Sequence, residues 1–251
     1  MEGVTVTTTA VALITGANKG IGLAIARLLA ERGMTVLLGA RDRERRAEAA
    51  AELRAEGVEV RPIALDVTDP DTVQAAAAHI DARFGRLDVL VDNAATSKGF
   101  HHLPGEADLD AVQRAFDTNV FGVVRVTNAM LPLLERSGAG RVVNVSSEAG
   151  SVTLMADTGG DLYRLPAQVD YPTSKAALNS LTVEYAKELR EQGIRVNAVT
   201  PGLCATDFNK ELGIPIPRTA ADGAAVAVEL AVGGFGDPTG GFFSEDGPVP
   251  W

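Results

Sequence analysis

The chain has 251 residues, of which 46% are hydrophobic and 22% charged, and its formal net charge is −10 at pH 7. This composition excludes a disordered chain, and the acidic balance argues against nucleic-acid binding, which needs a basic face. Cys204 is the single cysteine and excludes an intrachain disulfide, while no apolar run is long enough to span a bilayer. The N-terminus lacks a secretory signal, so we expect a soluble cytoplasmic protein with no membrane partner.

Short apolar runs alternate with helical patterns along the chain. The predicted strands are Val11–Ile14, Thr35–Leu38, Val58–Leu65, Leu87–Val91, Arg141–Ser146 and Ile194–Val199. The predicted helices are Ile21–Arg32, Asp42–Glu56, Pro70–Phe84, Asp108–Arg136 and Tyr171–Gln192. Continuous apolar strands separated by helices predict an α/β fold, a single doubly wound parallel sheet of the Rossmann type with helices on both faces. No repeat or interdomain linker interrupts this order, so we expect one domain over residues 1–251.

Three glycines follow the first predicted strand and open the first predicted helix. They are Gly16, Gly20 and Gly22, in the run Thr15-Gly16-Ala17-Asn18-Lys19-Gly20-Ile21-Gly22. Glycines in this place let the chain turn sharply and let backbone amides approach a pyrophosphate at the helix N-terminus. The strand–turn–helix context therefore predicts a dinucleotide site.

The end of the second predicted strand bears on the choice of dinucleotide. An acidic residue there holds the ribose 2′-hydroxyl of NAD, but this strand leads into Arg41 with no carboxylate before it. Asp42 better suits the N-cap of the next helix. Lys19 and Arg41 could together bind a 2′-phosphate, so NADPH is predicted over NADH, with two ordinary surface cations as the alternative.

Tyr171 and Lys175 lie four residues apart on a predicted helix and therefore share one face. A nearby ammonium stabilises a phenolate and lowers the pKa of the phenol, which makes the tyrosine a usable general acid and base. Neither Tyr163 nor Tyr185 has a lysine at that offset. We expect this pair to carry the proton chemistry.

Three connections are expected to form the substrate pocket, near residues 96–107, 151–170 and 203–218. The last two are long, structureless segments that follow strand ends at the carboxyl edge of the sheet, where doubly wound folds place ligands. Their apolar side chains hint at a hydrophobic pocket: Phe100, Leu154, Met155, Leu162, Phe208 and Leu212. His101 and His102 are interpreted as a solvated rim, because no further ligands converge with them on a metal.

Taken together, these motifs resemble those of the short-chain dehydrogenase/reductase family over residues 11–206. Gly16–Gly22 is similar to the family's TGxxxGxG, Tyr171–Lys175 to YxxxK, and Pro201–Thr206 to the PGxxxT that cradles the nicotinamide. Asp92-Asn93-Ala94-Ala95 resembles NNAG, with departures at its first and last positions that we expect to affect strand packing more than chemistry. The resemblance implies the following cofactor contacts: Gly16, Asn18, Lys19, Gly20, Ile21, Gly22, Arg41, Asp66, Val67, Asn93, Ala94, Tyr171, Lys175, Pro201, Gly202 and Thr206.

The resemblance also implies a catalytic tetrad. Asn119 matches the asparagine of the family's proton relay, and Ser147, rather than Ser146, matches the serine that holds the substrate carbonyl. The longer interval between Ser147 and Tyr171 is similar to that of the carbonyl reductase-like branch, whose members reduce ketones and aldehydes with NADPH. No metal site is expected.

The resulting hypothesis is an NADPH-dependent reductase of a small, hydrophobic ketone or aldehyde. One alternative is the same chemistry in the oxidative direction, as in an alcohol or steroid dehydrogenase. A second is a catalytically silent dinucleotide sensor, which would lack the tyrosine or lysine. A third is a dehalogenase-like relative, which would need a bulky residue in the glycine loop. Whether the protein is a monomer or a homo-oligomer stays open.

Overall fold

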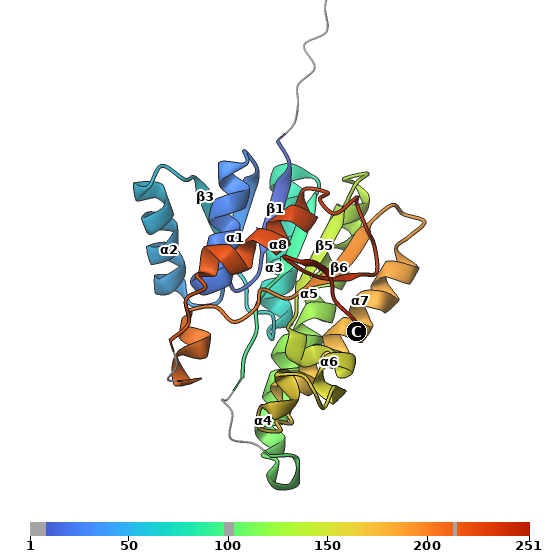
Figure 1. Ribbon diagram of the computed structural model, residues 1–251. Helices are drawn as coiled ribbons and strands as arrows, with labels where there is room; N and C mark the ends of the chain where they lie inside the picture. The colour runs from blue at the N-terminus through green and yellow to red at the C-terminus, as the bar shows by residue number, and fades with distance from the viewer. Residues whose placement is uncertain (1–8, 98–102, 213–214) are drawn as a thin grey trace, which may run out of the picture.

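The computed structural model describes residues 9–97, 103–212 and 215–251, shown in Figure 1. Within them the strands form one sheet in the order β3-β2-β1-β4-β5-β6-β7-β8, parallel at every pair except β7–β8. The strands are β1 (Val11–Ile14), β2 (Thr35–Ala40), β3 (Val60–Ala64), β4 (Val89–Asp92), β5 (Arg141–Val145), β6 (Arg195–Val199), β7 (Phe242–Ser244) and β8 (Gly247–Pro248). The predicted doubly wound parallel sheet is confirmed.

Helices cover both faces of the sheet and enclose two apolar cores. One core contains side chains of α1 (Gly20–Glu31), α2 (Arg43–Ala55) and α8 (Ala220–Ala231). The other contains side chains of α3 (Pro70–Phe84), α5 (Gly122–Glu135) and α7 (Tyr171–Glu188). The central strands β1 and β4 are buried on both faces, which explains why residues 11–14 and 89–91 are apolar without alternation.

Side-chain caps and left-handed glycines fix several of the helix ends. The carboxylate of Asp42 accepts a hydrogen bond from the Arg45 amide and begins α2, as expected for an N-cap. Pro70 occupies the first turn of α3 after its N-cap Asp69. Gly33 follows α1 with φ of +82°, a conformation that glycine adopts without strain.

The structure corrects several predicted boundaries and adds elements that were not predicted. The expected helix 108–136 is α4 (Leu109–Phe116), the π-helical turn η2 (Asp117–Phe121) and α5. Residues 151–170 and 203–218 are not structureless, because they contain α6 (Val152–Ala156) with η4 (Leu162–Arg164), and η5 (Asp207–Leu212). The elements α8, β7 and β8 follow the last predicted strand, and short 3-10 turns complete the list as η1 (Pro104–Glu106) and η3 (Glu148–Gly150).

The strand order places a topological switch between β1 and β4. The chain leaves β1 toward β2 and β3, then returns to the other side of β1 with β4. The turns at the carboxyl ends of β1 and β4 therefore diverge and leave a crevice there. Figure 1 shows α6 and η5 beyond this carboxyl edge, so two of the segments expected to bind substrate lie on the same side as the glycine loop.

Candidate active site

Hydrogen bonds connect the glycine loop, residues 15–22, to the residues that follow β4. The hydroxyl of Thr15 accepts from the amides of Asn93 and Ala94, at 2.9 and 3.0 Å. The side-chain amide of Asn93 donates in turn to the carbonyls of Thr15 and Gly16, at 2.9 and 3.2 Å. Asn93 was predicted to contact the cofactor. Its side chain stabilises the glycine loop that would bind the cofactor.

The loop glycines are required by close packing as well as by backbone conformation. Gly16 has φ of +63°, and a Cβ added there would lie 2.8 Å from the Cα of Ala94. A Cβ on Gly22 would lie 2.4 Å from Nδ2 of Asn93. Lys19 occupies the N-cap of α1 and supplies no side-chain cap. This N-terminus therefore offers a close backbone approach and uncapped amides, the features that suit a dinucleotide pyrophosphate.

The two cations predicted to bind a 2′-phosphate are placed differently. Arg41 directly follows β2, is exposed, and forms no ion pair with any residue that the structure describes. Lys19 is also exposed, but its Nζ lies 3.3 Å from Oδ2 of Asp207, in η5. Hydrogen bonds from Lys210 and Lys19 hold the pKa of Asp207 below its ordinary value. Asp207 is a residue of this site that the sequence did not predict.

The remaining predicted cofactor contacts lie on the same edge of the sheet. The Asp66 carboxylate accepts from the amide and hydroxyl of Thr68 in the turn after β3, and the side chain of Val67 is buried. Pro201 and Gly202 follow β6, and Gly202 has φ of +69°. A Cβ on Gly20 would lie 3.6 Å from Cγ2 of Thr206, so the glycine loop and the segment after β6 meet directly. Asn18 and Ile21 are half-buried in the same loop.

Asn119 lies in the π-helical turn η2 and is fully buried. Its Oδ1 accepts from the Thr96 amide at 2.8 Å, and its Nδ2 donates to the Thr96 carbonyl at 2.9 Å. Nδ2 also donates to Oγ of Ser174 at 2.9 Å, and that hydroxyl donates to the carbonyl of Tyr171 at 2.7 Å. Ser174, which the sequence analysis missed, therefore links Asn119 to the helix that carries Tyr171 and Lys175. Its position one residue before Lys175 gave no chemical signal of this role.

Tyr171 and Lys175 begin α7 and point to the same side, as predicted. The Lys175 Nζ lies 5.6 Å from the centre of the Tyr171 ring and donates to the carbonyl of Val145 at 2.7 Å. Burial lowers the pKa of Lys175 to about 7, with an opposing effect from the Asp92 carboxylate. Burial also raises the pKa of Tyr171 to about 12, and the hydrogen bond with Ser147 opposes that rise.

The expectation that Lys175 lowers the pKa of Tyr171 is therefore wrong in this structure. Removing the phenol from water disfavours the phenolate more than any neighbouring group favours it. Tyr171 is consequently a neutral phenol at pH 7, with its proton in place. A group in this state is a proton donor.

The two neighbouring serines after β5 have separate surroundings. Ser146 is buried, and its hydroxyl donates to Oδ1 of Asn179 at 2.6 Å. Ser147 is half-buried, accepts from the Ala149 amide at 3.2 Å, and is hydrogen-bonded to Tyr171. The structure thus brings Ser147, the serine predicted to hold the substrate carbonyl, to the tyrosine and leaves Ser146 in the core.

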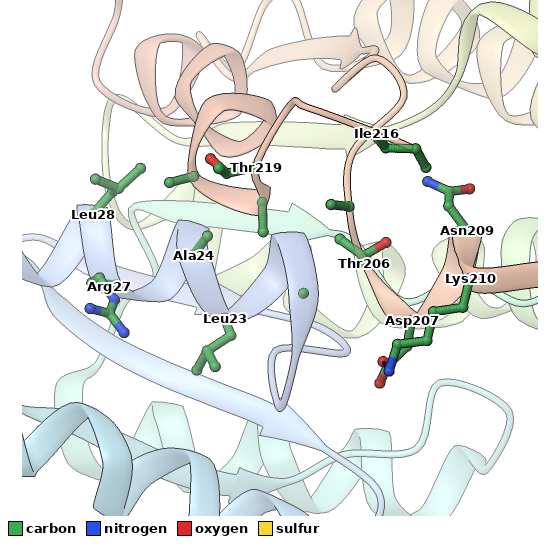
Figure 2. A pocket seen from close by; sticks show the side chains of 14 residues that line it. Leu23, Ala24, Arg27, Leu28, Thr206, Asp207, Asn209, Lys210, Ile216 and Thr219 are labelled. Carbon is green, nitrogen blue, oxygen red and sulfur yellow. Dashed lines mark ion pairs between the residues drawn. The ribbon is translucent and has the colours of Figure 1, made fainter. Parts of the chain in front are cut away.

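The ring of Phe208, in η5, contacts Tyr171 with 5.3 Å between ring centres. Its neighbours Asp207 and Asn209 line a cavity of about 750 Å³ on the other side of η5, shown in Figure 2. That cavity lies between α1 and the start of α8, with Leu23, Ala24 and Thr219 on its walls. None of the four predicted catalytic residues lines it. The segment η5 therefore contributes Phe208 to the tyrosine and its neighbours to this cavity.

Some of the residues singled out in the sequence lie outside the part of the chain that the structure describes. His101, His102 and Phe100 fall in the gap between residues 97 and 103, and the side chain of Leu212 is not described. Across the described ranges, no cluster of histidine, cysteine and carboxylate side chains could hold a metal ion. Among those same residues, no helix has the length and apolar character needed to cross a membrane.

Comparisons with known proteins agree with this architecture. The family model for short chain dehydrogenases matches residues 10–215. The chain is 34% identical to short-chain dehydrogenase/reductase 1 of Saponaria officinalis, over 96% of this chain and 95% of that protein. It is 34% identical to (-)-isopiperitenone reductase of Mentha piperita, over 94% and 96%. The solved structure of NADPH-bound carbonyl reductase from chicken fatty liver superposes with a TM-score of 0.84 at 26% identity, over 97% and 99% of the two chains.

The crevice, the glycine loop and these matches define an NAD(P)-binding oxidoreductase fold. The chain belongs to the short-chain dehydrogenase family. It is an enzyme of carbonyl and alcohol redox chemistry that acts on small molecules. The predicted family, fold class and enzyme class are confirmed.

Proposed function

We propose that the protein uses NADPH to reduce a hydrophobic ketone or aldehyde to the alcohol, acting as a single domain over residues 1–251. Ser147 donates a hydrogen bond to the substrate carbonyl, and Tyr171 donates the proton to the developing alkoxide. Lys175 binds the nicotinamide ribose and stabilises the phenolate that remains. Asn119 anchors the relay that resupplies the proton.

One observation carries this proposal, namely the convergence of Ser147 and Lys175 on Tyr171 at the end of β5. Ser147 is hydrogen-bonded to the phenol, and Lys175 is held under its ring by the carbonyl of Val145. The high pKa of Tyr171 keeps its proton in place at neutral pH. A protonated phenol is the form that donates the proton in the proposed reduction, and alcohol oxidation through the same residues is the alternative direction.

The cofactor preference is supported by charge at the end of β2. No carboxylate precedes Arg41, whose guanidinium is exposed and unpaired within the described chain, and Lys19 lies in the glycine loop. NADPH supplies a hydride to the carbonyl carbon when bound. The two cations would hold its 2′-phosphate, because both present donors that suit phosphate oxygens. The similar chicken enzyme was solved with NADPH bound.

An apolar substrate is supported by the surroundings of Tyr171. Phe208 contacts the tyrosine ring and remains 44% exposed, and Leu203 in the same connection is 47% exposed. An exposed aromatic ring beside a polar reacting group suits a ketone that carries an aryl or alkyl group. The name of the Mentha piperita relative also describes a reductase.

The test is oxidation of NADPH and of NADH with a panel of aryl ketones, α-keto esters and diketones, for the wild type and Tyr171→Phe. We expect NADPH-dependent turnover that the variant loses, while the variant still binds NADPH as measured by fluorescence titration. Tyr185→Phe is a matched control, because Tyr185 is on the same helix and its hydroxyl donates to Asn128. Activity of Tyr171→Phe within a fewfold of wild type would refute the assignment.

A further inference from the structure

Two buried side-chain oxygens on neighbouring strands have no hydrogen-bond partner among the described residues. They are Oδ1 of Asp92, at the end of β4, and Oδ1 of Asn144, in β5. Asp92 is 3% exposed and Asn144 is fully buried. The two residues are paired in the register of the parallel strands β4 and β5. Paired residues of a parallel ladder present their side chains to the same face of the sheet, so the two unpaired oxygens lie in one buried region.

The neighbouring hydroxyl groups hydrogen-bond in directions that leave both of these oxygens without a donor. The Thr182 hydroxyl donates its single hydrogen to the Leu178 carbonyl at 2.9 Å, so it can only accept from Asn144. Nδ2 of Asn144 donates to it at 2.9 Å, which turns Oδ1 of that amide away from Thr182. Thr127 donates to Oδ2 of Asp92 at 3.2 Å. Both unpaired oxygens therefore need a donor, and neither threonine has a hydrogen left to give.

Asp92 itself can supply the missing donor if its carboxyl group is protonated. We propose that Asp92 keeps its proton up to near-neutral pH, that in this form it donates its hydrogen to Oδ1 of Asn144, and that it thereby acts as a positioning residue whose loss of the proton favours the charged form of Lys175. One hydrogen would satisfy both unpaired oxygens at once. A carboxylate in the same place would have one hydrogen bond and an unpaired charged oxygen in the core, which is costly.

Burial acts in the direction that this arrangement needs. It raises the pKa of Asp92 to about 7, against the opposing effects of the Thr127 hydrogen bond and the Lys175 charge. The titratable groups that interact with Asp92 are Lys175 and Tyr185, both on α7. The helix α5 contributes Thr127, β5 contributes Asn144, and the paired segment of β1 is apolar.

The consequence for catalysis rests on the proposed role of Lys175. Loss of the Asp92 proton creates a negative charge that favours the Lys175 ammonium. The two groups therefore titrate together, and the charge beneath Tyr171 depends on both. The departure from asparagine at this position, which we expected to affect packing, would then tune the pH range of the enzyme.

The first experiment needs no turnover. In the full-length protein with 13C-labelled aspartate, NMR follows the Cγ resonances from pH 4 to 9, and Asp92→Asn assigns the resonance of interest. We expect one Cγ resonance to titrate near neutral pH and to be absent from Asp92→Asn. If that resonance titrates below about pH 5, as an ordinary aspartate does, the proposal is overturned whether or not the enzyme reduces ketones.

Two substitutions separate the hydrogen bond from the space that the side chain fills. Asp92→Asn keeps a donor for Asn144 and an acceptor for Thr127, so its thermal midpoint should stay close to that of wild type. Asp92→Leu removes both functions and should unfold at a clearly lower temperature. Equal losses of stability in the two variants would contradict the proposed donor.

The coupling to Lys175 is read from pH profiles. In Asp92→Asn, the NMR titration of Lys175 and the limb of the kcat/KM profile that follows it should move to lower pH by about one unit, because the charge of Asp92 is missing. Asp88→Asn, which removes a carboxylate near the opposite end of β4, should leave both unchanged. Lys175 titrating at the same pH in wild type and Asp92→Asn would overturn the coupling. If the protein shows no turnover, the pH profile of kcat/KM cannot be measured, and the NMR titration of Lys175 alone tests the coupling.

Discussion

Lys19 and Asp207 form an ion pair that joins the glycine loop to the segment after β6, with 3.3 Å between Nζ and Oδ2 across 188 positions of the chain. Asp207 also pairs with Lys210, its neighbour in η5, as Figure 2 shows. The cation predicted to bind a 2′-phosphate is thus already bound to a carboxylate. Binding of the phosphate by Lys19 would have to compete with Asp207.

Asp207→Asn is expected to strengthen NADPH binding by about two- to fivefold at low salt, because it removes a competing charge from an exposed ion pair. NADH binding should change less, since NADH has no 2′-phosphate. Fluorescence titration with both cofactors measures the effect. Asp161→Asn is a suitable control, because Asp161 forms an exposed ion pair with Arg164 in the segment 151–170. An equal change for the two cofactors would refute the competition.

Gly16→Ala is expected to lower the free energy of unfolding by more than about 2 kcal/mol. The new Cβ would combine a left-handed backbone with a contact of 2.8 Å to the Cα of Ala94. Gly33→Ala is the matched control, because Gly33 has φ of +82° but no atom within 4 Å of an added Cβ. It should lose only about 1 kcal/mol. Urea denaturation compares the two, and similar losses would show that the contact with Ala94 is unimportant.

Substitution of Ser147 should lower activity, whereas substitution of the adjacent Ser146 should lower stability. Ser147→Ala is expected to lower kcat/KM by about 10²–10³-fold with little loss of stability, because it removes a donor aimed at the reacting oxygen. Ser146→Ala removes the buried hydrogen bond to Asn179 and should cost about 1–3 kcal/mol of stability. Its kcat/KM should stay within a fewfold of wild type. Kinetics and urea denaturation of both variants check these assignments. A large loss of kcat/KM in Ser146→Ala, with only a loss of stability in Ser147→Ala, would reverse them.

The sequence was sufficient for the features that local pattern determines. Continuous apolar runs predicted the six parallel strands from β1 to β6, and the position of Asp42 predicted a cap. The motifs predicted the tyrosine, lysine, serine and asparagine that the structure brings together. The helix α8 escaped prediction because Gly223 interrupts an alanine-rich run. A Cβ at Gly223 would lie 2.5 Å from Sγ of Cys204, so this glycine is required by packing that only the fold creates.

Properties that depend on burial and on distant contacts could not be predicted. The ammonium of Lys175 was expected to lower the pKa of Tyr171, yet desolvation of both side chains dominates. The contacts of Asp207 with Lys19 and of Phe208 with Tyr171 each join segments far apart in the chain. No spacing rule within one segment reports such contacts.

The depressed pKa of Lys175 predicts a specific pH dependence of stability. Between about pH 7 and its ordinary value of 10.5, Lys175 is protonated in the unfolded chain but neutral in the folded protein. The unfolded state then binds more protons, so stability rises with pH in this window and is lost as pH falls toward 7. Lys175→Met lacks this dependence. From pH 7 to 9 the wild type should gain about 1–2 kcal/mol relative to the variant, measured by urea denaturation.

The control for this series is Lys187→Met, which removes an exposed lysine paired with Glu184 near the other end of α7. Its stability should follow that of wild type across the same pH range. Parallel curves for wild type and Lys175→Met would mean that Lys175 keeps an ordinary titration in the folded protein.

Phe208→Ala tests whether η5 forms the substrate side of the tyrosine. The ring of Phe208 contacts Tyr171 and leaves 44% of its surface exposed, so it can pack against a bound apolar group. We expect KM for an aryl ketone to rise about tenfold, the loss of one aromatic contact and its buried area, with little change for a small aliphatic ketone. Val232→Ala, a comparably exposed side chain at the end of α8, should leave KM unchanged. A proportional loss for both ketones would instead assign Phe208 to positioning of Tyr171, because a disturbed tyrosine slows every substrate alike.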